Sequence, residues 1–312
     1  MTTRRFALAL TLAVGCGPGG APGPGPAGST PDASGAPAHS TPSRSEPPTV
    51  APESAASPTI GAFTTLRPGL DLGVFDAPRP SSVGDSRITV VRVDPEQLRL
   101  VLHNASAPGE GARRSARAWA DRHGLLAVIN ASMFLDDHRT STHLMINGEH
   151  VNNPRTLADD NAFLVFDPED PADPGVRIVD RTCEDVDALR GRYRVVIQGI
   201  RMTSCRRENV WAPQPKIWSH AVLGVDDAGR FLMIHARSPF STHEFIDHLL
   251  ALPIGIAGLQ YAEGGPEAEL FVRAGGVELE RLGSYESGFN QNDDVAEAWA
   301  LPNVIGVVAR DP

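Results

Sequence analysis

A break in composition near residue 60 limits which part of this chain can fold. Residues 17–60 consist almost entirely of Gly, Ala, Pro, Ser and Thr. With hardly any large apolar side chain, such a segment cannot bury enough surface to offset the entropy cost of ordering. We therefore expect a disordered tether over residues 17–60 and one folded domain over residues 61–312, which is long enough to bury a full core.

The N-terminus has the pattern of an export signal. Arg4 and Arg5 precede an apolar run over residues 6–14, which is too short to cross a bilayer as a mature helix. Residues 12–16 (Leu-Ala-Val-Gly-Cys) are similar to a lipobox, in which Cys16 becomes the lipid-modified N-terminus. We interpret residues 1–16 as a lipoprotein-type signal peptide and expect a lipid-anchored cell-envelope protein. Simple secretion is the alternative if the lipobox is not used.

The charge distribution narrows the range of partners. The net charge is −10, and because the charges of the signal and the tether cancel, the domain carries all of it. An acidic domain argues against a nucleic-acid partner, although a local basic pocket can still hold one phosphate. Contact with a membrane is expected through the N-terminal lipid only.

Two cysteines remain once Cys16 is assigned to lipid. Outside the cytoplasm the default for Cys183 and Cys205 is a disulfide, and two buried free thiols are the alternative. No Cys-x-x-Cys motif indicates a redox or zinc site. We expect no cofactor; a divalent ion stays open as an alternative, although no residue spacing in the chain supports one.

Short β-type segments dominate the pattern along the domain. Strands are predicted over residues 125–129, 161–166, 193–198, 259–262 and 303–309, and hairpins over 87–103 and 221–234. One helix is predicted over residues 112–123, where Gly124 ends it, and another after the capping box at Ser241, where Pro253 ends it. The pattern favours an α+β fold with a mixed, mostly antiparallel sheet and a few flanking helices.

Two strands end in polar residues that could carry chemistry. Asn130 follows the buried run over residues 125–129, and Glu263 follows the run over residues 259–262 and opens the sequence Glu-Gly-Gly-Pro-Glu. A strand end holds a side chain rigidly, and the paired glycines allow a ligand to approach the backbone closely. A plain turn is the alternative for the glycines. His243 and His248 resemble a zinc-protease motif but are five residues apart, on different helix faces.

Taken in order, these motifs resemble those of the phosphodiester glycosidase family. The segments that carry the resemblance are residues 130–134 (Asn-Ala-Ser-Met-Phe), 147–148 (Asn-Gly), 198–201 (Gln-Gly-Ile-Arg), 218–229 and 263–267. It spans residues 89–308, nearly the whole domain. The sequence departs from the family pattern at Trp218, usually Arg, at Glu263, usually Asp, and at Glu267, usually Ser. The resemblance implies the fold and the location of the site more firmly than the substrate.

The resemblance implies cleavage of the bond between a sugar and a phosphate, which needs carboxylates at the sugar and a cation at the phosphate. Glu263 and Glu267 are the candidate catalytic acids, and His220 is a more speculative general acid. The candidate substrate-binding residues are Asn130, Arg201, Ser219, Arg237, Gly264 and Gly265. Surface ion pairs are the alternative for the arginines, and a strand-end cap is the alternative for Asn130. Asp137 and His143 are expected in a cleft wall, and Trp218 in packing at its rim.

Three functions stay open from sequence. The first is a cell-envelope hydrolase that cleaves a glycosidic bond in a sugar-1-phosphodiester or a related envelope glycan. The second is a lipoprotein that binds glycan in the same cleft without cleaving it. The third is a different hydrolase on the same scaffold. The first requires an acid, a guanidinium and an amide to face one pocket.

Overall fold

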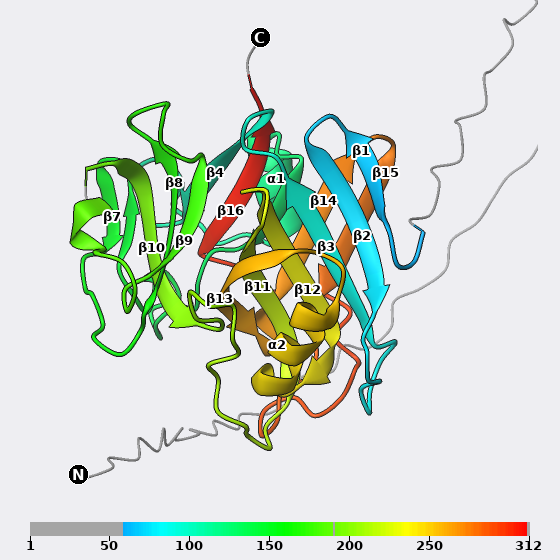
Figure 1. Ribbon diagram of the computed structural model, residues 1–312. Coiled ribbons are helices and arrows are strands. Elements are labelled where there is room, and N and C mark those ends of the chain that lie inside the picture. Colours follow the sequence, from blue (N-terminus) through cyan, green and yellow to red (C-terminus); the bar gives the residue numbers. More distant parts are fainter. Residues whose placement is uncertain (1–58, 190, 311–312) are drawn as a thin grey trace, which may run out of the picture. The chain divides into compact units, whose positions relative to one another are not determined.

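The computed structural model describes residues 59–189 and 191–310 (Figure 1). The predicted signal peptide with Cys16, and nearly all of the predicted tether, lie outside these residues. Within the described part, no helix is long and apolar enough to cross a membrane.

Two antiparallel sheets form the described domain (Figure 1). The larger sheet has the order β1-β2-β3-β12-β11-β13-β10-β6-β7, with β8 paired to β10 and β9 to β8. Its strands are β1 (Phe63–Arg67), β2 (Leu70–Asp76), β3 (Arg87–Val93), β6 (Met145–Asn147), β7 (His150–Asn153), β8 (Ala162–Pro168), β9 (Val176–Asp180), β10 (Tyr193–Arg201), β11 (Trp218–Asp226), β12 (Phe231–Phe240) and β13 (Ile256–Gly264). The smaller sheet has the order β15-β14-β5-β16-β4, from β4 (Leu98–Asn104), β5 (Ala127–Asn130), β14 (Glu269–Ala274), β15 (Val277–Leu282) and β16 (Asn303–Ala309).

The predicted α+β class is wrong, because the fold is mostly β. Only two α-helices, α1 (Ala116–His123) and α2 (Thr242–Ala251), occur in the described residues. The physical reason is that the sheets cover each other. The largest apolar cluster joins Leu223 and Met233 of the larger sheet to Ile129 and Val307 of the smaller one. Burial of these facing sides supplies the main hydrophobic stabilisation, so flanking helices are not needed for it.

Each α-helix covers one outer face. Phe245 and Leu249 of α2 pack with Val222 and Ile234 on the outer face of the larger sheet. Trp119 of α1 packs with Val128 and Val304 on the outer face of the smaller sheet. The strands at the centre of both sheets are therefore apolar on both sides, which explains the continuous apolar runs in the sequence.

The structure confirms the predicted signals at the helix ends. Ser241 caps α2 by accepting a hydrogen bond from the Glu244 N–H at 3.2 Å, which confirms the capping box. Gly124 ends α1 in the left-handed conformation, with φ of 64°. The first helix begins at Ala116 rather than at residue 112, because Ser115 is its N-cap and accepts from the Ala118 N–H.

One predicted hairpin is real and the other is not. β11 and β12 pair antiparallel through the turn at residues 227–230. β3 and β4, predicted as a hairpin over residues 87–103, belong to different sheets. The turn between them, at residues 94–97, carries the chain from one sheet to the other, and the Asp94 N–H donates to Gly69 O rather than across a hairpin. The five single strands predicted from sequence are present as β5, β8, β10, β13 and β16.

Candidate active site

Glu263 lies at the end of β13, where the strand pairing is irregular. Ala221 of β11 faces Glu263, but the next residue, Val222, faces Tyr261, so β13 carries one extra residue here. Such a bulge redirects a side chain near the end of a strand. The Glu263 side chain is buried, and among the described residues Oε1 accepts only the N–H of the next residue, Gly264, at 3.1 Å.

Glu267 follows within one turn, and Asn130 fixes that turn. Glu267 ends the short 3₁₀ helix η2 (Gly265–Glu267). The Asn130 side chain donates from Nδ2 to Glu267 O at 2.8 Å and accepts from the Glu269 N–H at 2.8 Å. Asn130 is buried and bonds the backbone on both sides of Ala268. It therefore positions the acid-bearing turn, and these two bonds occupy its amide.

A third carboxyl, Glu286, joins the first two, and no motif in the sequence indicates it. It belongs to the loop over residues 283–295, which follows β15. The turn leaves room for it, because a Cβ on Gly265 would lie 2.5 Å from Glu286 Oε2. Gly265 also has φ of +65°, which favours glycine. Gly283 completes the contact by donating its N–H to Ala268 O at 2.7 Å.

All three carboxyls have raised pKa values. The pKa of Glu263 lies well above its ordinary value because of burial first and then the charges of Glu267 and Glu286. Burial and then Glu286 raise the pKa of Glu267, while Arg113 opposes the shift. Burial raises the pKa of Glu286, while Lys216 opposes it. Like charges at close range cannot all ionise, so the cluster retains protons that free glutamates would lose.

Two aromatic side chains border the carboxyls. A Cβ on Gly264 would overlap with the Tyr261 hydroxyl and the Trp218 ring, so these groups lie over that glycine. Burial, and then the charge of Glu263, raises the pKa of Tyr261 well above 10, so its hydroxyl keeps its proton. Trp211 lies 5.7 Å from Tyr261, ring centre to ring centre, and lines a cavity of about 260 Å³ that reaches Arg201.

His220 and Ser219 lie beneath the site in the packed interior. The His220 ring stacks on Phe245 at 4.4 Å, and Nε2 lies 3.2 Å from Thr242 Oγ1. Burial, and then the nearby His235, lower the pKa of His220 to about 3, so its ring is neutral. The Ser219 hydroxyl donates to Arg237 O at 2.5 Å and accepts from the Ser284 N–H at 2.9 Å. Ser219 thus joins β11 to the 283–295 loop.

Both candidate phosphate-binding arginines have other partners. Arg237 donates from Nε to the Asp293 carboxylate at 2.5 Å. Its remaining donors bond three carbonyls, Leu282 O, Asp293 O and Val295 O, each at 3.0 Å. Arg237 therefore fastens the 283–295 loop.

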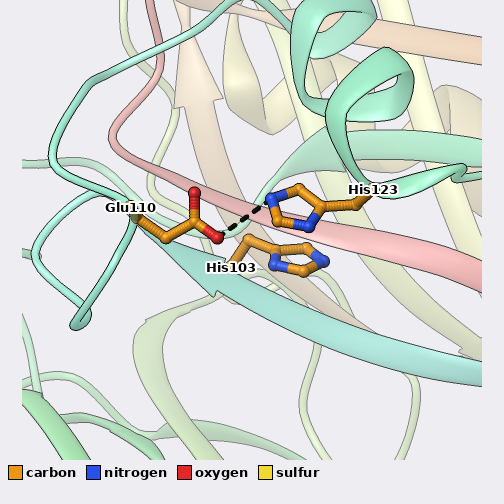
Figure 2. A group of neighbouring side chains, drawn as sticks. All are labelled: His103, Glu110 and His123. Atoms are coloured by element: carbon orange, nitrogen blue, oxygen red, sulfur yellow. Dashed lines mark ion pairs between the residues drawn. The ribbon is translucent and has the colours of Figure 1, made fainter.

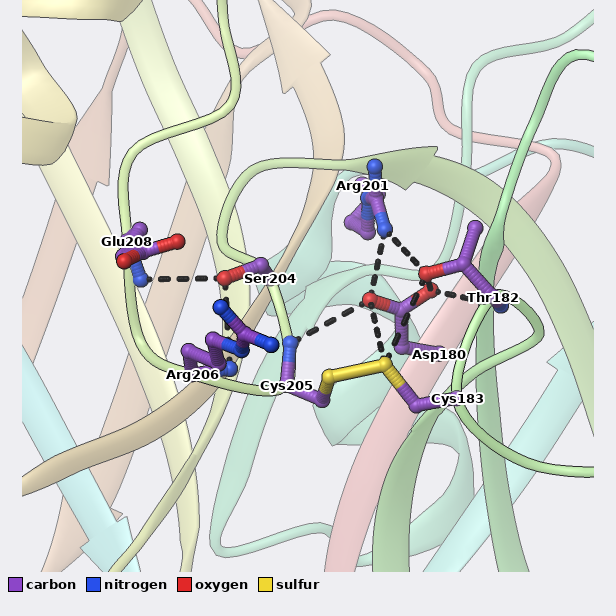
Figure 3. The surroundings of a disulfide bond; sticks show 8 residues. All are labelled: Asp180, Thr182, Cys183, Arg201, Ser204, Cys205, Arg206 and Glu208. Atoms are coloured by element: carbon purple, nitrogen blue, oxygen red, sulfur yellow. Dashed lines mark hydrogen bonds and ion pairs between the residues drawn. A yellow bond between two sulfur atoms is a disulfide. The ribbon is translucent and has the colours of Figure 1, made fainter.

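Arg201 donates from Nη1 to Asp180 Oδ2 at 2.6 Å and to Thr182 Oγ1 at 2.8 Å (Figure 3). Cys183 and Cys205 form a disulfide next to this pair, which confirms the predicted bond. Arg201 faces Gln260 across the strands, three residues before Glu263 on β13 and so roughly 10 Å away along the strand. Of the predicted acid, guanidinium and amide, the structure joins the acids and the amide and turns the guanidinium to Asp180.

The remaining residues noted in the sequence have defined contacts. His143 is buried, with Nε2 at 2.6 Å from Asp160 Oδ2 and Nδ1 at 2.6 Å from Thr142 Oγ1. Asp137 accepts the N–H groups of Arg139 and Thr140 at 2.9 Å and so shapes its own loop. His243 and His248 contact different groups: His243 lies 3.6 Å from Asp247, and His248 lies 3.8 Å from Glu244.

Comparison with known proteins identifies the family to which this chain belongs. Residues 123–308 match the family model for phosphodiester glycosidases, and the chain belongs to the phosphodiester glycosidase family. The resemblance seen in the motifs is thereby confirmed. No curated protein matches the sequence significantly.

Two solved structures share the fold. One is the catalytic domain of zebrafish N-acetylglucosamine-1-phosphodiester alpha-N-acetylglucosaminidase, auto-inhibited by its pro-peptide. It has a TM-score of 0.54 and 14% identity, with 78% of this chain and 85% of that chain covered. The other is a hypothetical protein from Synechocystis, with a TM-score of 0.52, 12% identity, and 82% and 64% covered. At such low identity these likenesses establish the fold.

Proposed function

We propose that the protein is a hydrolase that cleaves the glycosidic bond of a sugar-1-phosphodiester or of a related cell-envelope glycan. The observation that carries the proposal is the convergence of Glu263, Glu267 and Glu286 around one glycine turn, each with its pKa raised. Glycoside hydrolysis uses one carboxyl that still holds its proton and one that has lost it. A cluster of three acids that retains part of its protons provides both forms at once.

The burial of the acids suggests how the roles divide. Glu263 is the most buried of the three and the one whose pKa rises most clearly, so it is the proton donor. It gives its proton to the oxygen that leaves with the phosphate as the bond to the sugar breaks. Glu267 is more exposed and lies closer to a cation, so it is the carboxylate that takes the proton of the attacking water. The charge of Glu286 helps to keep Glu263 protonated.

The phosphate group must be bound by cations other than the two arginines predicted from sequence. Arg201 and Arg237 are held by Asp180 and Asp293. Lys216 and Arg113 are exposed, and each acts electrostatically on one of the three carboxyls. We assign the phosphate to Lys216, because it is two residues from Trp218, where the family usually has an arginine. The sugar would then lie against Trp218 and Tyr261.

The substrate is expected in the cell envelope because of the N-terminal pattern. Residues 1–16 have the order of a lipoprotein signal, and residues 17–60 are long enough to hold the domain away from a membrane. Replacement of Cys16 by Ser should move the protein from the membrane fraction to the soluble exported fraction. Continued membrane association of the Cys16→Ser variant would contradict the lipid anchor.

The activity is tested by release of free sugar from sugar-1-phosphodiesters. We expect kcat to fall about 10³-fold in Glu263→Gln, which cannot donate the proton, and about 10²-fold in Glu267→Gln. Exposed Glu96, in the turn between β3 and β4, supplies the control substitution Glu96→Gln, which should leave the rate unchanged. Equal rates in wild type and Glu263→Gln would reject the assignment of the site.

A second function, glycan binding without cleavage, is favoured by a separate observation. Phe289 and Trp299 are 60% and 39% exposed, and their rings contact each other edge to face at 6.1 Å. Exposed aromatic rings commonly stack on sugars, and Phe289 is in the same loop as Glu286. Tight binding of a glycan that requires Phe289, with no sugar released by the wild type, would establish this alternative.

A further inference from the structure

A cluster of metal-ligating side chains lies away from the carboxyl site, on the smaller sheet (Figure 2). His103 is in β4, Glu110 is in the connection between β4 and α1, and His123 is the last residue of α1. One ligand atom from each lies within 4.8 Å of the other two. Three segments of chain thus bring two imidazoles and a carboxylate to one point.

The half-buried His103 ring has an unused nitrogen. Its Nε2 is buried and has no hydrogen-bond partner among the described residues. Buried ring nitrogens in native proteins are nearly always bonded, so such an atom calls for a ligand.

The Glu110 carboxylate is held in position beside the two histidines by hydrogen bonds and an ion pair. Its Oε2 accepts Arg122 Nε at 2.8 Å and Arg114 Nη1 at 3.4 Å, and its Oε1 lies 3.0 Å from His123 Nε2. Hydrogen bonds from outside hold metal-binding carboxylates in the same way.

We propose that His103, Glu110 and His123 bind one divalent transition-metal ion of the Zn²⁺ type. Two imidazoles and one carboxylate are a ligand set that Zn²⁺ takes in proteins, with water as the fourth ligand. The bound ion would fix the 105–115 connection against α1. This site is independent of the proposed hydrolase activity, since none of its residues belongs to the carboxyl cluster.

The ring geometry predicts what binding changes. The His103 and His123 rings are stacked, with centres 3.9 Å apart and planes 19° apart. A shared ion must lie near the plane of both rings, so one ring has to turn out of the stack. Both rings also stack against Trp119, at 5.8 and 5.7 Å. Metal binding should therefore alter the fluorescence of Trp119.

The test uses the purified, untagged full chain after treatment with a chelator. Titration calorimetry with ZnCl₂ should give one site with a dissociation constant of about 1 µM or tighter. Tryptophan fluorescence should change along the same isotherm, and Trp119→Phe should lose that change while retaining the heat of binding. His103→Gln and His123→Gln should each weaken binding at least 100-fold. Exposed His138 gives the matched control His138→Gln, which should bind as the wild type does.

Three results would overturn the proposal: no saturable heat with Zn²⁺, unchanged affinity in the His103 and His123 variants, or equal loss in His138→Gln. If a histidine variant does not fold, as judged by circular dichroism, Glu110→Gln with CoCl₂ gives the decision. The visible spectrum of tetrahedral Co²⁺ should appear in the wild type and be lost or shifted in Glu110→Gln. A wild type without that spectrum would also reject the site.

Discussion

Residues 260–263 of β13 lead from one arrangement of buried charge to the opposite one. At the Gln260 end, Arg201 of β10 faces the strand and pairs with Asp180 of β9 at 2.6 Å, beside a disulfide. At the Glu263 end three carboxyls lie together, and the cations that act on them are exposed side chains. Burial pushes up the pKa of Asp180, but hydrogen bonds from Thr182 and then Arg201 outweigh it, so that pKa is lowered.

The comparison separates charge that holds the fold from charge that is available for chemistry. A paired ion loses most of its reactivity and stabilises the native state only while its partner stays in place. An unpaired buried acid costs stability, and proteins keep such groups mainly at functional sites. The same stretch of β13 therefore has a structural end, at Gln260, and a proposed reactive end, at Glu263, and four experiments can test that division.

The largest difference is expected between Asp180→Asn and Glu263→Gln. Removal of the Asp180 charge leaves Arg201 partly buried without a counter-ion, which should lower the free energy of unfolding by about 4 kcal/mol. Glu263→Gln removes an acid with no cationic partner, so it should leave stability at pH 8 unchanged or higher. Urea denaturation of both variants measures the difference. A loss of stability in Glu263→Gln equal to that in Asp180→Asn would contradict the division.

Loss of the disulfide should have the next largest effect. Cys183 and Cys205 are separated by 22 residues, and on the chain-entropy model a loop of that size contributes about 3 kcal/mol. The double variant Cys183→Ser, Cys205→Ser should unfold at correspondingly lower urea concentration. Because the bond lies at the structural end, sugar release at low temperature should persist in this variant. Complete loss of activity in a folded double variant would show that the two ends are coupled.

The buried carboxyl of Glu269 should make the stability of the domain depend on pH. Burial raises its pKa from 4.5 to about 8, although its Oε2 accepts the Ala116 N–H at 2.7 Å. Because the folded state binds this proton more tightly, the contribution of Glu269 to stability is complete below pH 4.5. It is lost as pH rises from 4.5 towards 8.

Glu269→Gln should therefore become more stable than the wild type as pH rises, by about 4 kcal/mol at pH 8. Urea denaturation at pH 5 and pH 8 measures the gap. A gap that narrows as pH rises would show that the carboxyl is ionised and stabilising in the native state.

The smallest effect is expected for an exposed ion pair. Arg194 and Glu169 form two hydrogen bonds of 3.0 Å, but both side chains are about half exposed. Solvent screens such pairs, so Glu169→Gln should leave the unfolding midpoint unchanged within error. A clear loss of stability in this variant would mean that exposure is a poor guide to which charges hold this fold.

The sequence alone predicts much of the local structure and points to two of the three clustered acids. Glu263 and Glu267 stand out because a buried strand ends in a glycine turn, which is a short-range pattern, and their catalytic role stays a prediction. Ser241 and Gly124 were read correctly as helix ends for the same reason. The strands were also found, since they follow from apolar runs of four to nine residues.

What the sequence could not predict depends on contacts between distant segments. The α+β class was wrong because nothing local shows that two sheets cover each other, or that the turn at residues 94–97 leads from one sheet to the other. Glu286 was missed because its approach to Gly265 is set by packing across 21 positions of chain. Arg201 was expected at the phosphate because its partner, Asp180, lies on another strand.

Because Arg237 anchors the 283–295 loop, a change at this one position could alter the acid cluster in other members of the family. Its guanidinium secures the segment that carries Glu286. A relative with a different residue at that place could keep every glutamate and still bring only two of the acids together. A comparison of the glutamate positions alone would miss such a change, whereas a comparison that includes the position of Arg237 would detect it.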